Sequence, residues 1–156
     1  MAQRPATIAH LLQAYLAADY RWEWEGQWYF LHLGQPAPGV EAAFPEATRF
    51  GLLSAWDPHS VKRSKRENQS ADEALHFWLA DSGLDYRPAF SSARDRTWRE
   101  PSWLVAGLPV EAFDSLAERF GQLGTLWWSR GEPIRLRMHA ACPDACGDER
   151  HVDWLK

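Results

Sequence analysis

The chain has 156 residues, of which 46% are hydrophobic and 24% are charged, as expected for one globular domain over residues 1–156. The formal net charge of -4 counts against general binding of polyanions. No apolar run reaches the roughly 18 residues that a membrane helix needs, so we expect no membrane span.

The N-terminal part predicts a helix, a β-hairpin and a second, short helix. Thr7 can cap a helix whose apolar residues recur every three or four positions through Leu16. The stretch 19–33 predicts two strands joined by a turn at Glu25–Gly26, and a short helix follows over 40–44. The N-terminus has no continuous apolar region before a cleavage site, so we expect no signal peptide and a cytoplasmic location.

Residues 49–129 predict strands and helices in the order β-α-β-β-α-β. The expected strands are 49–56, 84–90, 101–108 and 125–129, and the expected helices are 64–82 and 109–120. This order is that of the ferredoxin-like, split β-α-β unit, so the fold class is α+β, with the N-terminal helix and hairpin as additions. A further strand over 133–139 alternates apolar and polar residues, which suits an extra C-terminal edge strand. Residues 49–138 would then form the core and 139–156 a tail.

Three finer predictions concern single positions. Ser64 and Glu67 have the spacing of a capping box at a helix start. Pro88 cannot donate a hydrogen bond to a neighbouring strand, which favours an edge position for its strand. Trp127 and Trp128 are adjacent on one strand and point to opposite faces, so one of them is a candidate for an exposed interface.

The predicted topology brings three segments to one edge of the sheet. They are the strand end at Trp56 and Asp57, the helix start over 60–68, and the loop over 91–102. A helix start offers free backbone N–H groups, and basic residues surround this one, so the edge suits a phosphate, carboxylate or nucleotide. The residues expected to bind this ligand are Trp56, Asp57, Ser60, Arg63, Asn68, Arg96, Glu100 and Ser102.

Within this set Arg63 and Arg96 would hold the anion, and Ser60 and Asn68 would orient it. The candidates for a general acid or base are Glu67, Glu100 and His59. The residues leave open whether any chemistry follows binding. A solvated helix face is the alternative explanation of the basic run over 62–66, since most charged runs of this kind simply face water.

The same residues carry a family resemblance. The pattern Ala-Trp-Asn-Pro-x-Ser, then Glu-Asn at a helix start, then Glu-Pro-Ser before a strand resembles a bacterial family known as domain-of-unknown-function family 3293, from about Tyr15 to Arg137. The matching residues are Ala55, Trp56, Pro58, Ser60, Glu67, Asn68, Glu100, Pro101 and Ser102. Asp57 stands where the pattern has Asn. The resemblance implies that these residues occur together and implies no activity.

The tail contains a set of residues that zinc could use. His139, Cys142, Cys146 and His151 offer the side-chain types of a tetrahedral zinc site, at spacings near the common ones. Two free thiols or a short-loop disulfide explain the cysteines equally well. We expect no other cofactor.

Two alternatives to a small-ligand site stay open. Some single-stranded nucleic-acid binders share the β-α-β-β-α-β order, but the strand over 102–108 lacks their basic-glycine-aromatic signature, the central strands are apolar on both faces, and the net charge is acidic. A regulatory or assembly module, including a homo-oligomer, is the other alternative.

Overall fold

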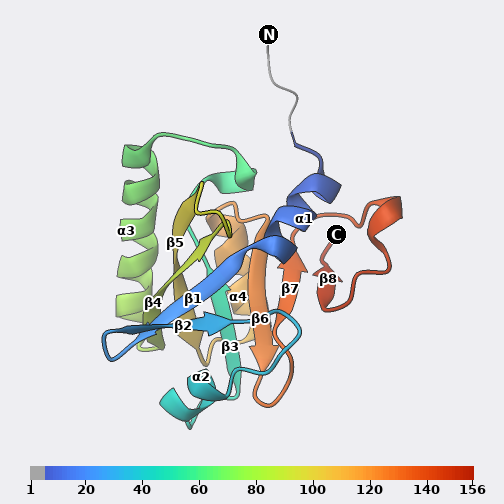
Figure 1. Cartoon of the computed structure of the whole chain (residues 1–156). Helices are drawn as coiled ribbons and strands as arrows, with labels where there is room; N and C mark the ends of the chain where they lie inside the picture. The colour runs from blue at the N-terminus through green and yellow to red at the C-terminus, as the bar shows by residue number, and fades with distance from the viewer. Residues whose placement is uncertain (1–5) are drawn as a thin grey trace.

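One eight-stranded sheet organises the fold (Figure 1). The protein is described by a computed structural model over residues 6–156. The strands lie side by side in the order β2 (Gln27–Leu31), β1 (Asp19–Trp24), β4 (Asp85–Ser92), β5 (Arg99–Ala106), β3 (Arg49–Leu53), β6 (Gly124–Ser129), β7 (Arg135–Met138) and β8 (Val152–Trp154). These neighbours are antiparallel except β7 and β8, which are parallel, so the protein is a mixed α+β structure.

Helices cover both faces of this sheet. They are α1 (Ile8–Ala17), α2 (Pro38–Ala43), α3 (Lys65–Ser82) and α4 (Val110–Arg119). On β3, Phe50 and Leu52 join the apolar cluster that includes α1 and α2, whereas Leu53 joins the cluster formed with α3 and α4. The doubly apolar pattern of this strand therefore reflects a central position with helices on either side. Among residues 6–156, no helix has both the length and the hydropathy that crossing a membrane requires.

The local signals in the sequence are confirmed at the helix starts. The Thr7 hydroxyl accepts a hydrogen bond from the backbone N–H of His10 at 3.1 Å and caps α1. Ser64 accepts from the backbone N–H of Glu67 at 3.1 Å, and its hydroxyl donates to the Glu67 carboxylate at 2.9 Å. The predicted capping pair therefore starts α3, and Glu67 is used for this purpose.

The prediction that the Pro88 strand is an edge strand is wrong, because β4 lies between β1 and β5. The paired residues of β1 and β4 run from Asp19 opposite Ser92 to Trp22 opposite Ala89, and stop there. Pro88 lies one residue beyond the last pair. The missing N–H of proline is thus tolerated in an inner strand, because the pairing of β4 with β1 has already ended at that position.

The expected C-terminal edge strand is also corrected. β7 lies between β6 and β8, so the tail after Met138 returns to the sheet and supplies the edge. The Arg135 guanidinium donates to the Asp153 carboxylate at 2.8 and 2.9 Å, and Arg137 donates to Asp114 of α4. The polar face of β7 is therefore occupied by ion pairs to neighbouring elements.

The expected exposure of one of two adjacent tryptophans is wrong as well. Trp127 and Trp128 are 8% and 1% exposed, because α4 covers one face of β6 and the α1–α2 side covers the other. The exposed aromatic residues of the sheet lie instead on the edge strand β2, at Trp28, Tyr29 and Phe30.

Gly51 on β3 provides a test of how tightly α4 packs on the sheet. A Cβ atom at this position would lie 2.4 Å from the ring of Phe113, and that ring is fully buried. We expect Gly51→Ala to lower the free energy of unfolding by about 1–3 kcal/mol, as overpacking does in other cores. Chemical denaturation measures this change.

The matched control is Gly147→Ala. Gly147 has φ of -67°, and a Cβ atom added there would have no other atom within 4 Å, so the same substitution should change the free energy of unfolding by less than about 0.5 kcal/mol. Equal effects at the two positions would contradict the close packing of Phe113 on Gly51.

Candidate functional site

A hydrogen-bond network ties the segment after β3 to the start of α3. The backbone N–H of Asp57 donates to Oδ1 of Asn68 at 2.9 Å, and Nδ2 of Asn68 donates back to Oδ1 of Asp57 at 2.8 Å. Oδ1 of Asp57 also accepts from the backbone N–H of Arg63 at 3.1 Å. Asp57 has φ of 43°, in the left-handed region, so these bonds hold a backbone conformation that costs free energy.

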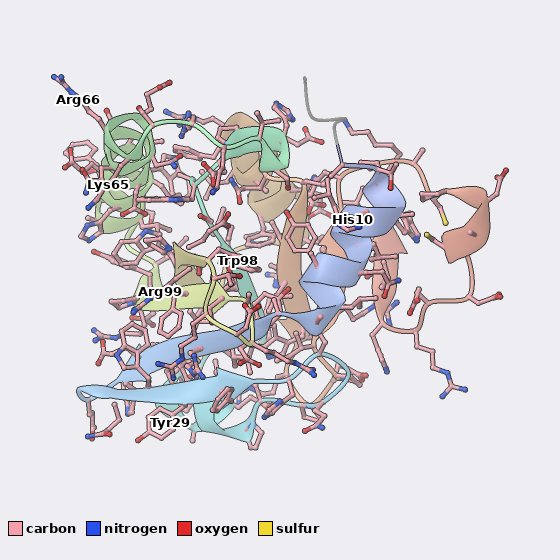
Figure 2. All side chains as sticks on the ribbon, turned by 45° about the horizontal axis from the view of Figure 1, so that its top comes forward. His10, Tyr29, Lys65, Arg66, Trp98 and Arg99 are labelled. Carbon is pink, nitrogen blue, oxygen red and sulfur yellow. The ribbon has the colours of Figure 1, made fainter. Side chains whose placement is uncertain are left out.

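Arg63 closes this network. Its Nε donates to Oδ1 of Asn68 at 2.7 Å, and its Nη2 donates to the carbonyl of Ala55 at 2.9 Å. The guanidinium thus braces the loop between β3 and α3. The other basic residues of the run, Lys62, Lys65 and Arg66, are exposed, and Figure 2 shows Lys65 and Arg66 projecting outward from the start of α3.

The pleat of β4 and β5 separates residues that the sequence analysis had placed in one site. Glu100 and Ser102 alternate with Leu104 of the α1–α2 cluster, so they lie on that face of the sheet. Arg99, one residue earlier, lies on the opposite face, which α3 and α4 cover further along. The structure therefore brings Glu100 and Ser102 into one cavity, with Ser60 hydrogen-bonded to Tyr15 of its lining, and places Arg96 of the β4–β5 loop elsewhere.

On the α1–α2 face lies a small cavity of about 20 Å³, which we name the polar chamber. Its polar lining consists of Tyr15, Tyr20, Ser54, Ser91, Glu100, Ser102, Gln122 and Thr125. Tyr15 of α1 closes it, because its hydroxyl hydrogen-bonds Ser60 at 3.0 Å and its ring packs on Gly124, where a Cβ atom would lie 2.9 Å from the ring.

Glu100 has an unusual environment in the polar chamber. Burial, and then the nearby charge of Asp57, raise the pKa of its carboxyl from 4.5 to about 7. A carboxyl with a pKa near neutrality can either take or give a proton under physiological conditions. Of the three acid–base candidates in the sequence analysis, Glu100 therefore has the most suitable surroundings: Glu67 caps a helix, and His59 is exposed.

On the opposite face lies a hollow of about 360 Å³, the arginine hollow. It is lined by Arg21, Trp28, Phe90, Ser92, Arg96 and Arg99. The Arg99 guanidinium lies 3.8 Å from the ring centroid of Phe90, and Arg21 lies between the rings of Phe30, at 4.3 Å, and Phe90, at 5.4 Å. The Ser92 hydroxyl is buried there without a hydrogen-bond partner.

Two residues of the arginine hollow were missed because they come from the hairpin. β1 pairs with β4 and brings Arg21 directly opposite Phe90, and β2 adds Trp28. The available signal was the alternation of Arg21 with the apolar Tyr20 and Trp22, which marks it as a residue of the other face. Trp56, which the sequence analysis expected to bind the ligand, lines neither the chamber nor the hollow.

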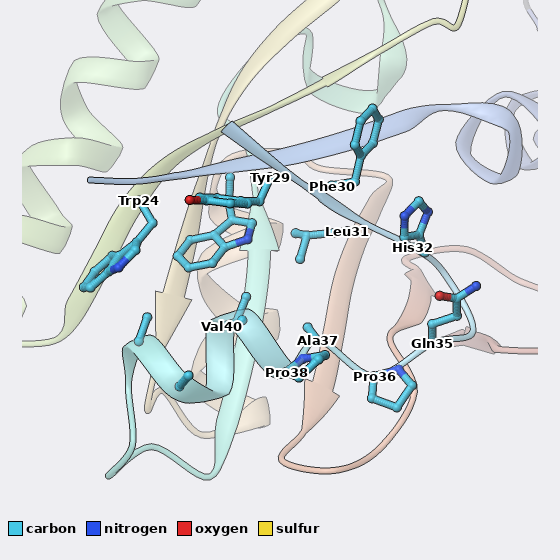
Figure 3. A pocket seen from close by; sticks show the side chains of 14 residues that line it. Trp24, Tyr29, Phe30, Leu31, His32, Gln35, Pro36, Ala37, Pro38 and Val40 are labelled. Atoms are coloured by element: carbon cyan, nitrogen blue, oxygen red, sulfur yellow. The ribbon is translucent and has the colours of Figure 1, made fainter. Parts of the chain in front are cut away.

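A third hollow, of about 680 Å³, lies between β2 and α2 (Figure 3). Trp24 and Tyr29 stand over Val40 in it, and His32 is the one titratable imidazole of its lining. The lining contains no carboxylate, lysine or arginine, so this hollow is mostly apolar.

The tail residues proposed for zinc have separate surroundings. Cys146 is buried in the core, Cys142 is exposed, and both are free thiols. Burial lowers the pKa of His139, and the His151 ring packs against Gly34. Within residues 6–156 no three such side chains are grouped so as to share a metal ion, and the zinc site stays a prediction.

The raised pKa of Glu100 predicts how stability depends on pH. Between pH 4.5 and about 7 the folded carboxyl keeps its proton while the unfolded one loses it, so the free energy of unfolding should fall as the pH rises through this range. The fall is at most about 3 kcal/mol, at roughly 1.4 kcal/mol per pKa unit. We expect Glu100→Gln to remove it and the exposed-site control Glu73→Gln to retain it, as measured by denaturation at several pH values. Parallel pH profiles of Glu100→Gln and the unmutated protein would contradict the assignment.

The comparison with family models supports the resemblance inferred from the motifs. The model described as "Protein of unknown function (DUF3293)" matches residues 53–124. No curated protein and no solved structure gave a significant match. The matched segment is shorter than the range from Tyr15 to Arg137, but it contains the Asp57–Asn68 network and both Glu100 and Ser102. Over residues 53–124 the chain therefore resembles the family described as protein of unknown function DUF3293.

Proposed function

We propose that the protein binds a small anionic ligand, with a phosphate or carboxylate group, in the arginine hollow. The observation that carries this proposal is a buried Ser92 hydroxyl without a partner, surrounded by guanidinium groups. Among the described residues Arg96 and Arg99 form no ion pair, and the nearest carboxylate to Arg21 is that of Asp19, at 3.9 Å. An anion would supply the acceptors that these donors lack.

The aromatic rings favour this use of the arginines. A guanidinium stacked on a ring keeps its plane fixed while its N–H edge stays free to donate. Arg99 on Phe90 and Arg21 between Phe30 and Phe90 have this arrangement. Less side-chain entropy is then lost when a ligand binds, which strengthens binding.

The proposal keeps Arg96 of the predicted anion site and moves the site away from the helix start. Arg63, the other predicted anion ligand, already donates to Ala55 and Asn68. The exposed Lys65 and Arg66 line neither the polar chamber nor the arginine hollow and fit the solvated helix face that the sequence analysis kept as its alternative.

We also infer that the core is a ferredoxin-like, split β-α-β unit. The support is the element order β3-α3-β4-β5-α4-β6 together with the spatial order β4–β5–β3–β6, in which all neighbours are antiparallel. In such a unit the β4–β5 loop emerges at the same end of the sheet as the start of α3.

Binding of single-stranded nucleic acid is the second candidate. It is favoured by Trp28 and Phe30, which are 44% and 50% exposed beside the arginines and could stack bases. The acidic net charge and the helices on both faces of the sheet count against it.

Substitutions of the arginines test the proposed site. We expect Arg99→Gln and Arg96→Gln each to weaken the binding of inorganic pyrophosphate about tenfold, equivalent to about 1.4 kcal/mol, because each removes a charged donor. Isothermal titration calorimetry measures the affinity. The control is Arg66→Gln, which makes the same charge change at an exposed site and should alter the affinity less than about twofold. An equal loss in all three variants would indicate nonspecific attraction and contradict the site.

A salt titration separates the two candidate ligands. If the site binds a small anion through two or three arginines, a fluorescently labelled oligonucleotide should bind weakly and compete poorly with pyrophosphate. A nucleic-acid site would instead bind the oligonucleotide better than pyrophosphate, with an affinity that falls steeply as the salt concentration rises. Fluorescence anisotropy at several salt concentrations distinguishes these outcomes.

A further inference from the structure

The polar chamber on the other face of the sheet contains acceptors that no residue within 6–156 satisfies. Oγ of Ser102 and Oγ1 of Thr125 are buried without a hydrogen-bond partner, and both residues are 3% exposed. The carboxylate of Glu100 accepts no hydrogen bond from the described residues, although it lines the same cavity. Buried polar groups are nearly always paired in folded proteins, so two free buried hydroxyls beside an unpaired carboxylate around one cavity indicate a missing occupant.

Apart from the hydroxyls of Ser102 and Thr125, which can donate as well as accept, several donors around the chamber are already in use. Nε2 of Gln122 donates to the carbonyls of Trp56 at 3.2 Å and Phe120 at 3.3 Å. The Tyr20 hydroxyl donates to the carbonyl of Tyr15, and the Ser54 hydroxyl donates to that of Pro101. No lysine or arginine lines the cavity. The ionised carboxylate of Glu100 can only accept, so an occupant that pairs with it brings donors of its own.

The carboxylates near the chamber also favour an occupant that donates hydrogen bonds. Glu100 is largely removed from water and lies close enough to Asp57 for the two carboxylates to repel each other. A neutral water molecule could satisfy the hydroxyls but would leave this repulsion uncompensated, whereas a cation would relieve it. The cavity of about 20 Å³ has room for one group of the size of water or ammonium.

We propose that the polar chamber binds an ammonium group, with the Glu100 carboxylate as its counter-ion and the hydroxyls of Ser102 and Thr125 as acceptors. An ammonium group has donors and no acceptor, which matches a cavity whose free groups are a carboxylate and two hydroxyls. With α1 in place the chamber holds the ion alone. A longer primary amine would extend past Tyr15, whose hydrogen bond to Ser60 is the contact that it would displace.

The two sites thus have opposite preferences on opposite faces of β4 and β5. The arginine hollow has free donors and suits an anion, and the polar chamber has free acceptors and suits a cation. The ammonium site does not depend on the anion site, because they share no lining residue.

Thermal unfolding in different chloride salts tests the proposal with the whole protein at pH 8, where Glu100 is ionised. At equal ionic strength, we expect ammonium to raise the unfolding midpoint by several degrees above its values in potassium and in tetramethylammonium. Potassium matches ammonium in charge and approximate size but cannot donate hydrogen bonds, and tetramethylammonium is too large for the cavity.

Three variants locate the effect. Glu100→Gln should abolish the ammonium-specific rise, Ser102→Ala should reduce it, and the exposed control Glu73→Gln should leave it unchanged. Ser102→Ala keeps the test valid if Glu100→Gln does not fold, because it removes one acceptor and no charge. Equal midpoints in the three salts, or an ammonium-specific rise that both chamber variants retain in full, would overturn the proposal.

Discussion

The two-residue period of a β-strand is the constraint on which this structure depends. Successive side chains of β3, β4 and β5 point to opposite faces, so a central strand needs an apolar partner on each side. The helices α1 and α2 supply one partner, and α3 and α4 supply the other. The same period divides the polar residues at the sheet end, because Arg99 and Glu100 are neighbours in sequence and lie on different faces. The residues predicted to form one site therefore lie in two separate places on the sheet.

The two sites also differ in how their polar groups are placed. In the arginine hollow the guanidinium groups of Arg21 and Arg99 lie on aromatic rings and remain partly in contact with water. Their charges therefore lower the stability of the protein very little. In the polar chamber the carboxyl of Glu100 is removed from water and lies near Asp57, which raises its pKa to about 7. The placement of this carboxyl therefore lowers the free energy of unfolding at neutral pH. Such a cost is typical of functional sites, where groups are held ready for a ligand.

The loop between β3 and α3 positions the residues that border the chamber. Asp57, His59 and Ser60 all have positive φ values, and hydrogen bonds compensate for this backbone conformation. The paired bonds of Asp57 and Asn68 and the brace formed by Arg63 hold the loop so that Ser60 meets Tyr15. Of these residues, Ser60 and Asn68 carry part of the family resemblance, and each completes a hydrogen bond that holds this loop.

The amino-acid sequence was sufficient to predict the features that depend on interactions between residues close together in the chain. Side-chain capping at Thr7 and Ser64, apolar periodicity, and turn residues such as Gly26 act within a few positions, so the order of helices and strands could be predicted from them. The meeting of the β3 end, the α3 start and the β4–β5 loop followed from that order. Pairing between distant strands could not be predicted, because it depends on which edge offers unpaired backbone groups after folding. Only the tertiary structure therefore placed β1 beside β4 with Arg21 in the hollow, β8 beside β7, and Tyr15 over Glu100.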